Sequence, residues 1–338
     1  MTPLVVEAEA GWCGGRELHR PARVLVDGTG VHWSPGIPEP DVVRRVRVPG
    51  VLVPGLVDHH VHTDQIDPPA LLAGGITCVR DLGAPAGFVF ELARRSEQDP
   101  GLPRILPAGP FLTAPGGYPT DRLWAQEGSC RPLRDAVDAE RTVHDLAAQG
   151  ACLVKVAMNA DAGPVLGDAE LRAVVGAARD AGLLVVAHAE GDDQAERALD
   201  AGVDELAHVP WTHRLADEVI RRCAARTAWT STMDIHGWGK DTPGREIAMD
   251  NLRRFARAGG RVRYGTDLGN GPLPLGVNVR ELQALSDAEL SPVRILASIA
   301  TSARELAVLP GDPLTDPLMT SRVTAVVRAG VYRERTSG

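Results

Sequence analysis

The sequence predicts an α/β protein: a (β/α)8 barrel with a small β-sandwich domain formed from both chain termini. Between residues 53 and 307, short continuous apolar runs alternate with amphipathic helical patterns, which is typical of a parallel sheet covered by helices. These runs match the strands of a barrel of about 250 residues in number and in total length. Before residue 53, β-branched runs end at Gly or Pro and no helical period is visible.

The β domain is assigned to residues 1–52 plus 308–338, in an abbreviated form. Residues 22–28 and 44–50 are its clearest N-terminal strands. Residues 320–334 read as one or two strands that rejoin the N-terminal ones.

The barrel is assigned to residues 53–307. Its eight predicted strands are the apolar runs 52–62, 76–83, 104–113, 152–158, 183–190, 203–210, 227–234 and 261–269. A doubly wound parallel sheet is the alternative, because it produces the same alternation of strands and helices.

Helical patterns lie between several of these runs. Apolar residues recur at helical spacing in 167–182, with Asp168 as the expected N-cap and Gly182 as the stop. A second helix covers 245–260 and also ends at Gly. Ser291 and Pro292 are typical of an N-cap and the first helical position, so we expect one helix over 292–309.

Composition excludes several classes of protein. The 338 residues include 36 Lys and Arg against 44 Asp and Glu, a net charge of −8, which argues against a nucleic-acid-binding protein. The chain has no apolar run of about 18 residues, so we expect no membrane span. The five cysteines are scattered without a CxxC motif, which favours reduced thiols and a cytoplasmic location.

Metal-ligand side chains stand at the ends of the predicted barrel strands. The carboxyl ends of barrel strands meet at one mouth, where active sites are built. His60 and His62 are two residues apart and therefore point to the same side of their strand. Histidine and carboxylate ligands suit Zn²⁺ or a related divalent ion. The full set is His60, His62, Lys155, His188, His208 and Asp267.

These strands resemble the amidohydrolase superfamily of metal-dependent hydrolases, over most of the chain. The first strand, PGLVDHHVH, is similar to the superfamily's Pro-Gly-Leu-Val-Asp-x-His-x-His signature. CLVKV resembles the strand whose lysine becomes carboxylated, VVAHAEG and DELAHVP the two further histidine strands, and YGTDLG the eighth strand. GGITCVRDLG and LTAPGGYPT resemble the imidazolonepropionase-like and Xaa-Pro-dipeptidase-like branch.

The resemblance implies a binuclear site that uses two divalent metal ions. Zn²⁺ is the first candidate, and Mn²⁺, Fe²⁺ and Co²⁺ are alternatives. His60, His62 and Asp267 would hold one ion, and His188 and His208 the other. Lys155, carboxylated by carbon dioxide or bicarbonate, would bridge them. A metal-bridging hydroxide would attack the substrate carbonyl, and Asp267 would carry the proton to the leaving nitrogen.

Two further residues are candidates for substrate contact. Tyr118 lies in the Gly-rich loop after the third run, where it either polarises the substrate carbonyl or is an aromatic residue of a glycine turn without a role in the reaction. His236 follows the seventh run on the mouth side and is expected to contact a substrate carbonyl or carboxylate. Arg80 and Asp81 are interpreted as a buried ion pair that supports the barrel.

The implied function is hydrolysis of an amide-type C–N bond in a small cyclic amide, an N-acyl amino acid or a dipeptide. A deaminase, lactonase or decarboxylase is the alternative, because the same site serves several reactions. A non-catalytic scaffold is a further alternative. The expected partner is a small-molecule substrate, and a homo-oligomer is left open. The segments 62–77 and 302–317 are shorter than the superfamily pattern, so we expect fewer strands in the β domain and leave the substrate open.

Overall fold

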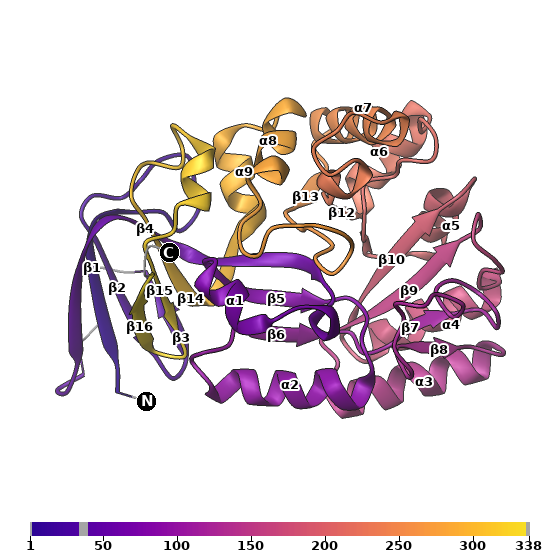
Figure 1. Ribbon diagram of the computed structural model, residues 1–338, viewed down its shortest axis with the longest axis horizontal. Helices are drawn as coiled ribbons and strands as arrows, with labels where there is room; N and C mark the ends of the chain where they lie inside the picture. Colours follow the sequence, from indigo (N-terminus) through magenta and orange to yellow (C-terminus); the bar gives the residue numbers. More distant parts are fainter. Residues whose placement is uncertain (1, 34–39, 336–338) are drawn as a thin grey trace.

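The computed structural model describes residues 2–33 and 40–335. It confirms the predicted fold class: a parallel α/β barrel beside a sheet built from both ends of the chain (Figure 1). Its strands are β1 Leu4–Gly11, β2 Ala22–Asp27, β3 Gly30–His32, β4 Arg44–Val61, β5 Ile76–Asp81, β6 Arg104–Pro107, β7 Phe111–Thr113, β8 Cys130–Pro132, β9 Leu153–Asn159, β10 Leu184–Glu190, β11 Glu205–Leu206, β12 Ala228–Thr230, β13 Arg261–Arg263, β14 Ala300–Leu309, β15 Ala325–Arg328 and β16 Val331–Glu334.

Helices follow most of the barrel strands and cover the outside of the barrel (Figure 1). The α-helices are α1 Pro68–Ala73, α2 Ala86–Gln98, α3 Ala136–Gln149, α4 Asp168–Asp180, α5 Gln194–Ala201, α6 Asp217–Arg226, α7 Pro243–Arg257, α8 Val279–Asp287 and α9 Pro292–Ile299, and the 3-10 helices are η1 Thr63–Gln65, η2 Met233–His236 and η3 Pro317–Ser321. None of the helices in the described ranges is both long and apolar enough to cross a membrane.

Strands from two sheets together form the closed barrel. The order β4-β5-β6 continues through the bent segment 104–113, in which β6 pairs with β5 and β7 pairs with β9. The parallel strands β9 to β13 follow in sequence order. Closure comes from hydrogen bonds between the last strand and β4: Asp267 N–H donates to the His60 carbonyl at 2.8 Å, and His62 N–H to that of Leu268 at 2.8 Å. The eighth strand therefore lies directly beside the first.

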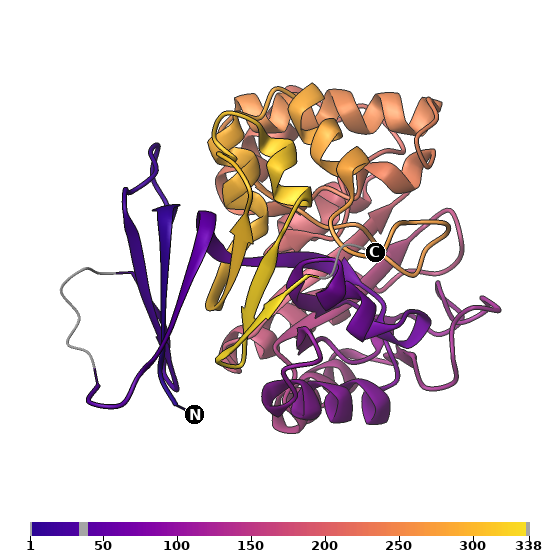
Figure 2. The same cartoon turned by 60° about the vertical axis from the view of Figure 1, so that its left-hand side comes forward.

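The N-terminal and C-terminal strands share one small core. β4 pairs with β1 over its first half and with β5 over its second, so one strand runs from the β domain into the barrel. β14 pairs with the middle of β4 and with β15. The buried side chains of Val6, Val24, Leu306 and Val327 pack together between these strands. Figure 2 shows the indigo N-terminal strands and the yellow C-terminal strands on the same side of the barrel. The prediction that both termini build this domain is confirmed, whereas its boundaries at 52 and 308 stay a prediction.

One predicted helix is wrong in its second half. Ser291 and Pro292 open α9 as expected, but the helix ends at Ile299 and residues 300–309 form β14. Pairing of Leu306, Ala307 and Val308 with β4 replaces the helical bonds that this stretch would otherwise make. In α4 the N-cap is Gly167, so Asp168 is the first helical residue instead of the cap. Helix α7 covers most of the predicted helix 245–260.

A buried ionic cluster crosses the barrel interior. The carboxylate of Glu205 on β11 accepts from Arg80 on β5 at 3.0 Å and from Arg263 on β13 at 2.6 Å. Thr230 also donates to Glu205, at 2.7 Å. This cluster corrects the prediction of an Arg80–Asp81 pair, because neighbouring residues on a strand point to opposite faces. Asp81 instead accepts from the backbone N–H of Thr63 at 2.8 Å.

Replacing Glu205 with glutamine is expected to lower the free energy of unfolding by about 3 kcal/mol. The substitution keeps the shape of the side chain but leaves two arginines without their buried counter-ion, since Glu205 is 1% exposed. Urea unfolding measures the effect. The matched control is Glu218→Gln, which removes an exposed pair with Arg221 and should change stability by less than about 1 kcal/mol. Equal effects of both substitutions would contradict the prediction.

Candidate metal centre and substrate cavity

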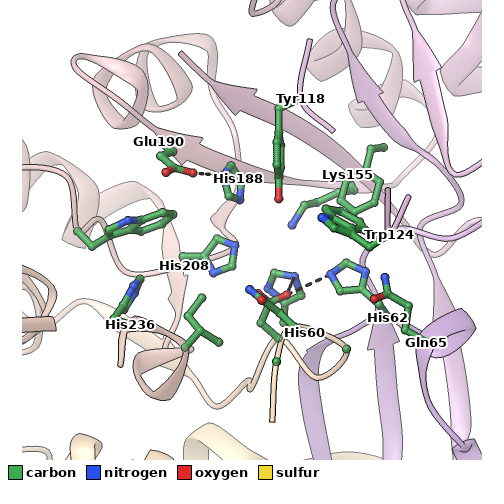
Figure 3. Close-up of a pocket in the computed structure, with 17 residues that line it drawn as sticks. His60, His62, Gln65, Tyr118, Trp124, Lys155, His188, Glu190, His208 and His236 are labelled. Atoms are coloured by element: carbon green, nitrogen blue, oxygen red, sulfur yellow. Dashed lines mark hydrogen bonds and ion pairs between the residues drawn. The ribbon is translucent and has the colours of Figure 1, made fainter. Parts of the chain in front are cut away.

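The eight predicted site residues line one cavity of about 470 Å³ at the carboxyl ends of the barrel strands. His60 and His62 come from the end of β4, Lys155 from β9 and His188 from β10. His208 follows β11, and Asp267 follows β13. Figure 3 shows Lys155 and the histidines of these strands gathered around a common centre. The structure therefore brings together residues that are up to 207 positions apart, since 267 − 60 = 207. They are His60, His62, Tyr118, Lys155, His188, His208, His236 and Asp267.

A tight subset of these residues has the geometry of a metal site. The ligand atoms of His60, His208 and Asp267 all lie within 4.8 Å of one another, and all three residues are buried. Nε2 of His60 is 2.9 Å from Oδ1 of Asp267, and Nε2 of His62 is 3.1 Å from the same oxygen. Ligand atoms that each lie about 2.0–2.2 Å from one Zn²⁺ are separated by about this distance or slightly more.

Each histidine ring is oriented by a hydrogen bond at its other nitrogen. Nδ1 of His60 donates to the Ala207 carbonyl at 2.9 Å, and Nδ1 of His62 to the Gly83 carbonyl at 3.0 Å. Nδ1 of His208 contacts the Thr232 hydroxyl at 2.8 Å, and Nε2 of His188 contacts Glu190 at 2.9 Å. Metal-binding histidines are oriented by contacts of this kind. The free nitrogen of each ring is thus turned toward the centre of the cluster (Figure 3).

The contact between His60 and Asp267 is expected to be stabilised by a bound cation. Because Nδ1 of His60 donates to a carbonyl, a neutral ring presents the lone pair of Nε2 to Asp267. Burial, and after it the Lys155 ammonium, lower the pKa of His60 to about 4, so the ring is neutral at pH 7. A lone pair and a carboxylate oxygen 2.9 Å apart repel each other unless a positive charge lies against both. The donor set fits a divalent metal ion.

Lys155 is a buried lysine in the middle of this cluster. It is 1% exposed, and its register partner on β10 is Val186, two residues before His188. Burial lowers the pKa of Lys155 to about 7, so much of the amine is neutral at physiological pH. A neutral amine is the form that reacts with carbon dioxide. The environment therefore suits the predicted carboxylation, which itself stays a prediction.

Tyr118 and His236 reach the cavity from segments outside the barrel strands. The Tyr118 ring stacks on His188 with centroids 5.2 Å apart, and its hydroxyl points toward the ligand cluster (Figure 3). Burial raises the pKa of this hydroxyl, so it stays a neutral donor. The His236 ring packs against Trp211 at 4.8 Å, and its buried Nε2 has no hydrogen-bond partner in the described chain. Burial lowers the pKa of His236 to about 4, so at pH 7 it offers a hydrogen bond without a charge.

Glu190, Gln65, Phe111 and Trp124 line the cavity but escaped the sequence analysis. Glu190 follows His188 at the same-face spacing of a strand, a signal that was available in AHAE. Asn270 donates to Oδ2 of Asp267 at 2.9 Å and so orients this carboxylate. Gln65, Phe111 and Trp124 complete the wall on the His62 side.

Glu281 anchors the segment that carries His236. Its carboxylate accepts from the backbone N–H groups of Met233 and Asp234, both at 2.9 Å. Asp234 in turn pairs with Arg280 at 2.7 Å. These bonds hold η2 against α8 and fix the direction in which His236 leaves the backbone. Burial raises the pKa of Glu281 from 4.5 to about 7 in spite of its two amide donors.

Because of this raised pKa of Glu281, the free energy of unfolding is expected to decrease as the pH rises from 4.5 to 7. Over this range the folded protein retains a proton that the unfolded chain has released. The contribution is complete below pH 4.5 and decreases by about 3 kcal/mol as the pH rises through 7. Urea unfolding at about pH 5 and about pH 7.5 tests this, with Glu281→Gln as the variant that lacks the titration. A variant that loses as much stability as the wild type would contradict the assignment.

Comparison with known proteins identifies the family. The amidohydrolase family model matches residues 51–302. One similar solved structure is a Xaa-Pro dipeptidase with bound methionine in the active site, with 19% sequence identity, a TM-score of 0.75, and coverage of 98% of this chain and 100% of that chain. Another is A. niger ochratoxinase, with 19% sequence identity, a TM-score of 0.76, and coverage of 98% of this chain and 96% of that chain. The structure of phenylurea hydrolase B is also similar, with 17% sequence identity, a TM-score of 0.77, and coverage of 99% of this chain and 97% of that chain. No curated protein sequence matches significantly. The structural likeness at these identities shows the fold, and the family match over most of the barrel shows that the chain belongs to the amidohydrolase family of hydrolases.

Proposed function

We propose that the protein is a metal-dependent amidohydrolase that cleaves an amide-type C–N bond in a small molecule. The observation that carries this proposal is the clustering of the buried ligand atoms of His60, His208 and Asp267 within 4.8 Å of one another, inside a cavity lined by further histidines. His60, His62 and Asp267 would hold one ion, and His188 and His208 a second. Lys155, as a carbamate, would bridge them. Bound divalent ions would polarise the substrate carbonyl and lower the pKa of a water molecule.

The chain's own residues then divide the remaining work. Water adds to the acyl carbon, the C–N bond breaks, and one proton moves from the water to the leaving nitrogen. Asp267 is placed to accept this proton and return it, because Asn270 and the histidines fix its carboxylate at the centre of the cavity. The Tyr118 hydroxyl donates to the substrate oxygen. His236 contributes a neutral hydrogen bond at the far wall.

Metal content is the first measurement that tests this function. In protein purified without added metal or chelator, elemental analysis should find about two divalent ions per chain. Chelation should abolish hydrolysis of an active substrate from a panel of amides, lactams and dipeptides, and metal with bicarbonate should restore it. The panel is followed by amine, ammonia, acid and carbon dioxide release, so that a deaminase or decarboxylase reaction is recognised. About one ion would favour a mononuclear site. A protein that binds no ion, even with added metal and bicarbonate, would contradict the proposal.

A further inference from the structure

The charged side chains that line the cavity indicate which charge the substrate carries. Among the described residues, no arginine lines it, and the only lysine is Lys155 within the ligand cluster. Substrate carboxylates are most often recognised by arginine, whose planar guanidinium forms two parallel hydrogen bonds with them. The cavity therefore lacks the usual partner for the free carboxylate of an amino acid or a dipeptide.

Nearby arginines are held outside the cavity by other partners. The Arg122 guanidinium lies 5.6 Å from the Tyr118 ring centroid and pairs with Asp121 at 3.1 Å. Arg280 pairs with Asp234, and Arg245 donates to the Met233 carbonyl at 3.1 Å. Turning Arg280 or Arg245 toward the substrate would break an existing bond. Arg122, whose Nε has no hydrogen-bond partner among the described residues, lies behind Tyr118 and does not line the cavity. They do not supply the missing positive charge.

Glu190 adds a negative charge to the wall. Its Oε2 accepts from Asn159 at 2.6 Å and contacts His188 at 2.9 Å, which fixes the side chain beside the cluster. The Glu190 side chain is 24% exposed and lines the cavity, so its carboxylate is accessible to a bound substrate. A substrate carboxylate at this wall would meet a like charge.

Aromatic rings form the walls on both sides of the ligand cluster. Trp124 packs near Phe111 and Tyr118, each at 6.1 Å between ring centroids, on the His62 side (Figure 3). Trp211 packs against His208 at 5.3 Å and His236 at 4.8 Å on the other side. Trp124 is 40% exposed although it lines the cavity, so one of its edges is open to an incoming ring. Flat apolar groups gain most from such walls.

We propose that the substrate is an uncharged amide with an aryl or similarly flat apolar group, and that molecules with a free carboxylate are poor substrates. This inference rests on the proposed function and narrows it. Of the three substrate types implied by the family resemblance, it disfavours N-acyl amino acids and dipeptides, which carry a free carboxylate, and leaves the small cyclic amide.

A matched pair of anilides tests the inference. 4-Acetamidobenzamide and 4-acetamidobenzoate have nearly the same shape, and only the second carries a charge. Hydrolysis of the anilide C–N bond of either compound releases acetate and the corresponding aniline. Chromatography separates these products from the 4-acetamidobenzoate and ammonia that cleavage of the primary amide of the benzamide would release, and only anilide cleavage is compared. For the metal-loaded protein we expect kcat/KM to be at least about tenfold higher for the benzamide. Dissociation constants of both compounds, measured by tryptophan fluorescence quenching, should show the same preference without turnover. Equal or better binding of the benzoate would overturn the inference.

Gln65→Arg provides a gain-of-function test in the same cavity. Gln65 lines the wall near His62 and Trp124, where an arginine would supply the missing cation (Figure 3). The variant should reduce the preference for the benzamide at least about threefold, and Gln65→Met, of similar length but uncharged, should leave it unchanged. Trp124→Ala should weaken the binding of both compounds about tenfold. Phe88 is an exposed aromatic residue on α2, so Phe88→Ala should change the binding of neither compound. Failure of the proposed function is distinguishable, since it would appear as a loss of metal-dependent hydrolysis of every amide and not as a changed ratio.

Discussion

Replacing Lys155 with alanine should remove at least one metal ion per chain and lower kcat by about 10²–10³-fold. The buried amine, with a pKa of about 7, lines the cavity together with His60, His188 and Asp267, where a carbamate would reach both ions. Elemental analysis and steady-state kinetics measure the two effects. In the wild type, ¹³C-bicarbonate should also label a carbamate carbon that nuclear magnetic resonance detects.

Chemical rescue separates a bridging role from a packing role. The space left by Lys155→Ala admits acetate or propionate, whose carboxylate replaces the carbamate oxygens. We therefore expect partial recovery of metal content and activity with either acid. Lys155→Met is the matched control, because its side chain fills the space and leaves no room for the acid. An alanine variant that keeps both ions and full activity would exclude the bridge.

Asp267→Asn should lower kcat by about 10²–10⁴-fold, because an amide cannot carry the proton from water to the leaving nitrogen. Asp267 has a left-handed backbone, with φ of 59°, a conformation that asparagine adopts readily. The fold should therefore persist, as circular dichroism can verify. The control is Asp193→Asn, an exposed aspartate with φ of 63°, which should leave kcat unchanged. An active Asp267→Asn enzyme would move the proton transfer to another group.

The barrel strands and the ligand positions could be predicted because their signals are local. A strand that is buried on both sides has a continuous apolar run, and its carboxyl end is fixed by the direction of the chain. His60, Lys155, His188 and Asp267 therefore converge without any knowledge of the loops. The predicted ion pair of Arg80 with Asp81 was wrong because no local signal in the sequence identifies the actual partner of Arg80. That partner, Glu205, lies on a strand that is distant in the sequence.

Elements that depend on tertiary contacts could not be predicted in this way. Residues 300–309 combine helix-forming Ala, Arg, Glu and Leu, yet they form β14 because the edge of β4 is available for pairing. Trp124 reaches the cavity in a loop tied to the barrel by Gln126, which donates to the Asp64 carbonyl at 3.0 Å. A contact between loops 62 positions apart leaves no periodic trace in the sequence.

The continuity of β4 has a consequence for folding cooperativity. Arg44 to Leu52 complete the small sheet, and the same strand ends one residue after His60. β14 pairs with β4 at the junction of the two domains, so neither has a flexible hinge on this side. Loss of the N-terminal strands would remove the pairing of residues 44–52 of β4 with β1, and we expect the alignment of His60 and His62 on the same strand to be lost with it. We expect the two domains to unfold in one transition, with the metal centre and the small sheet lost together.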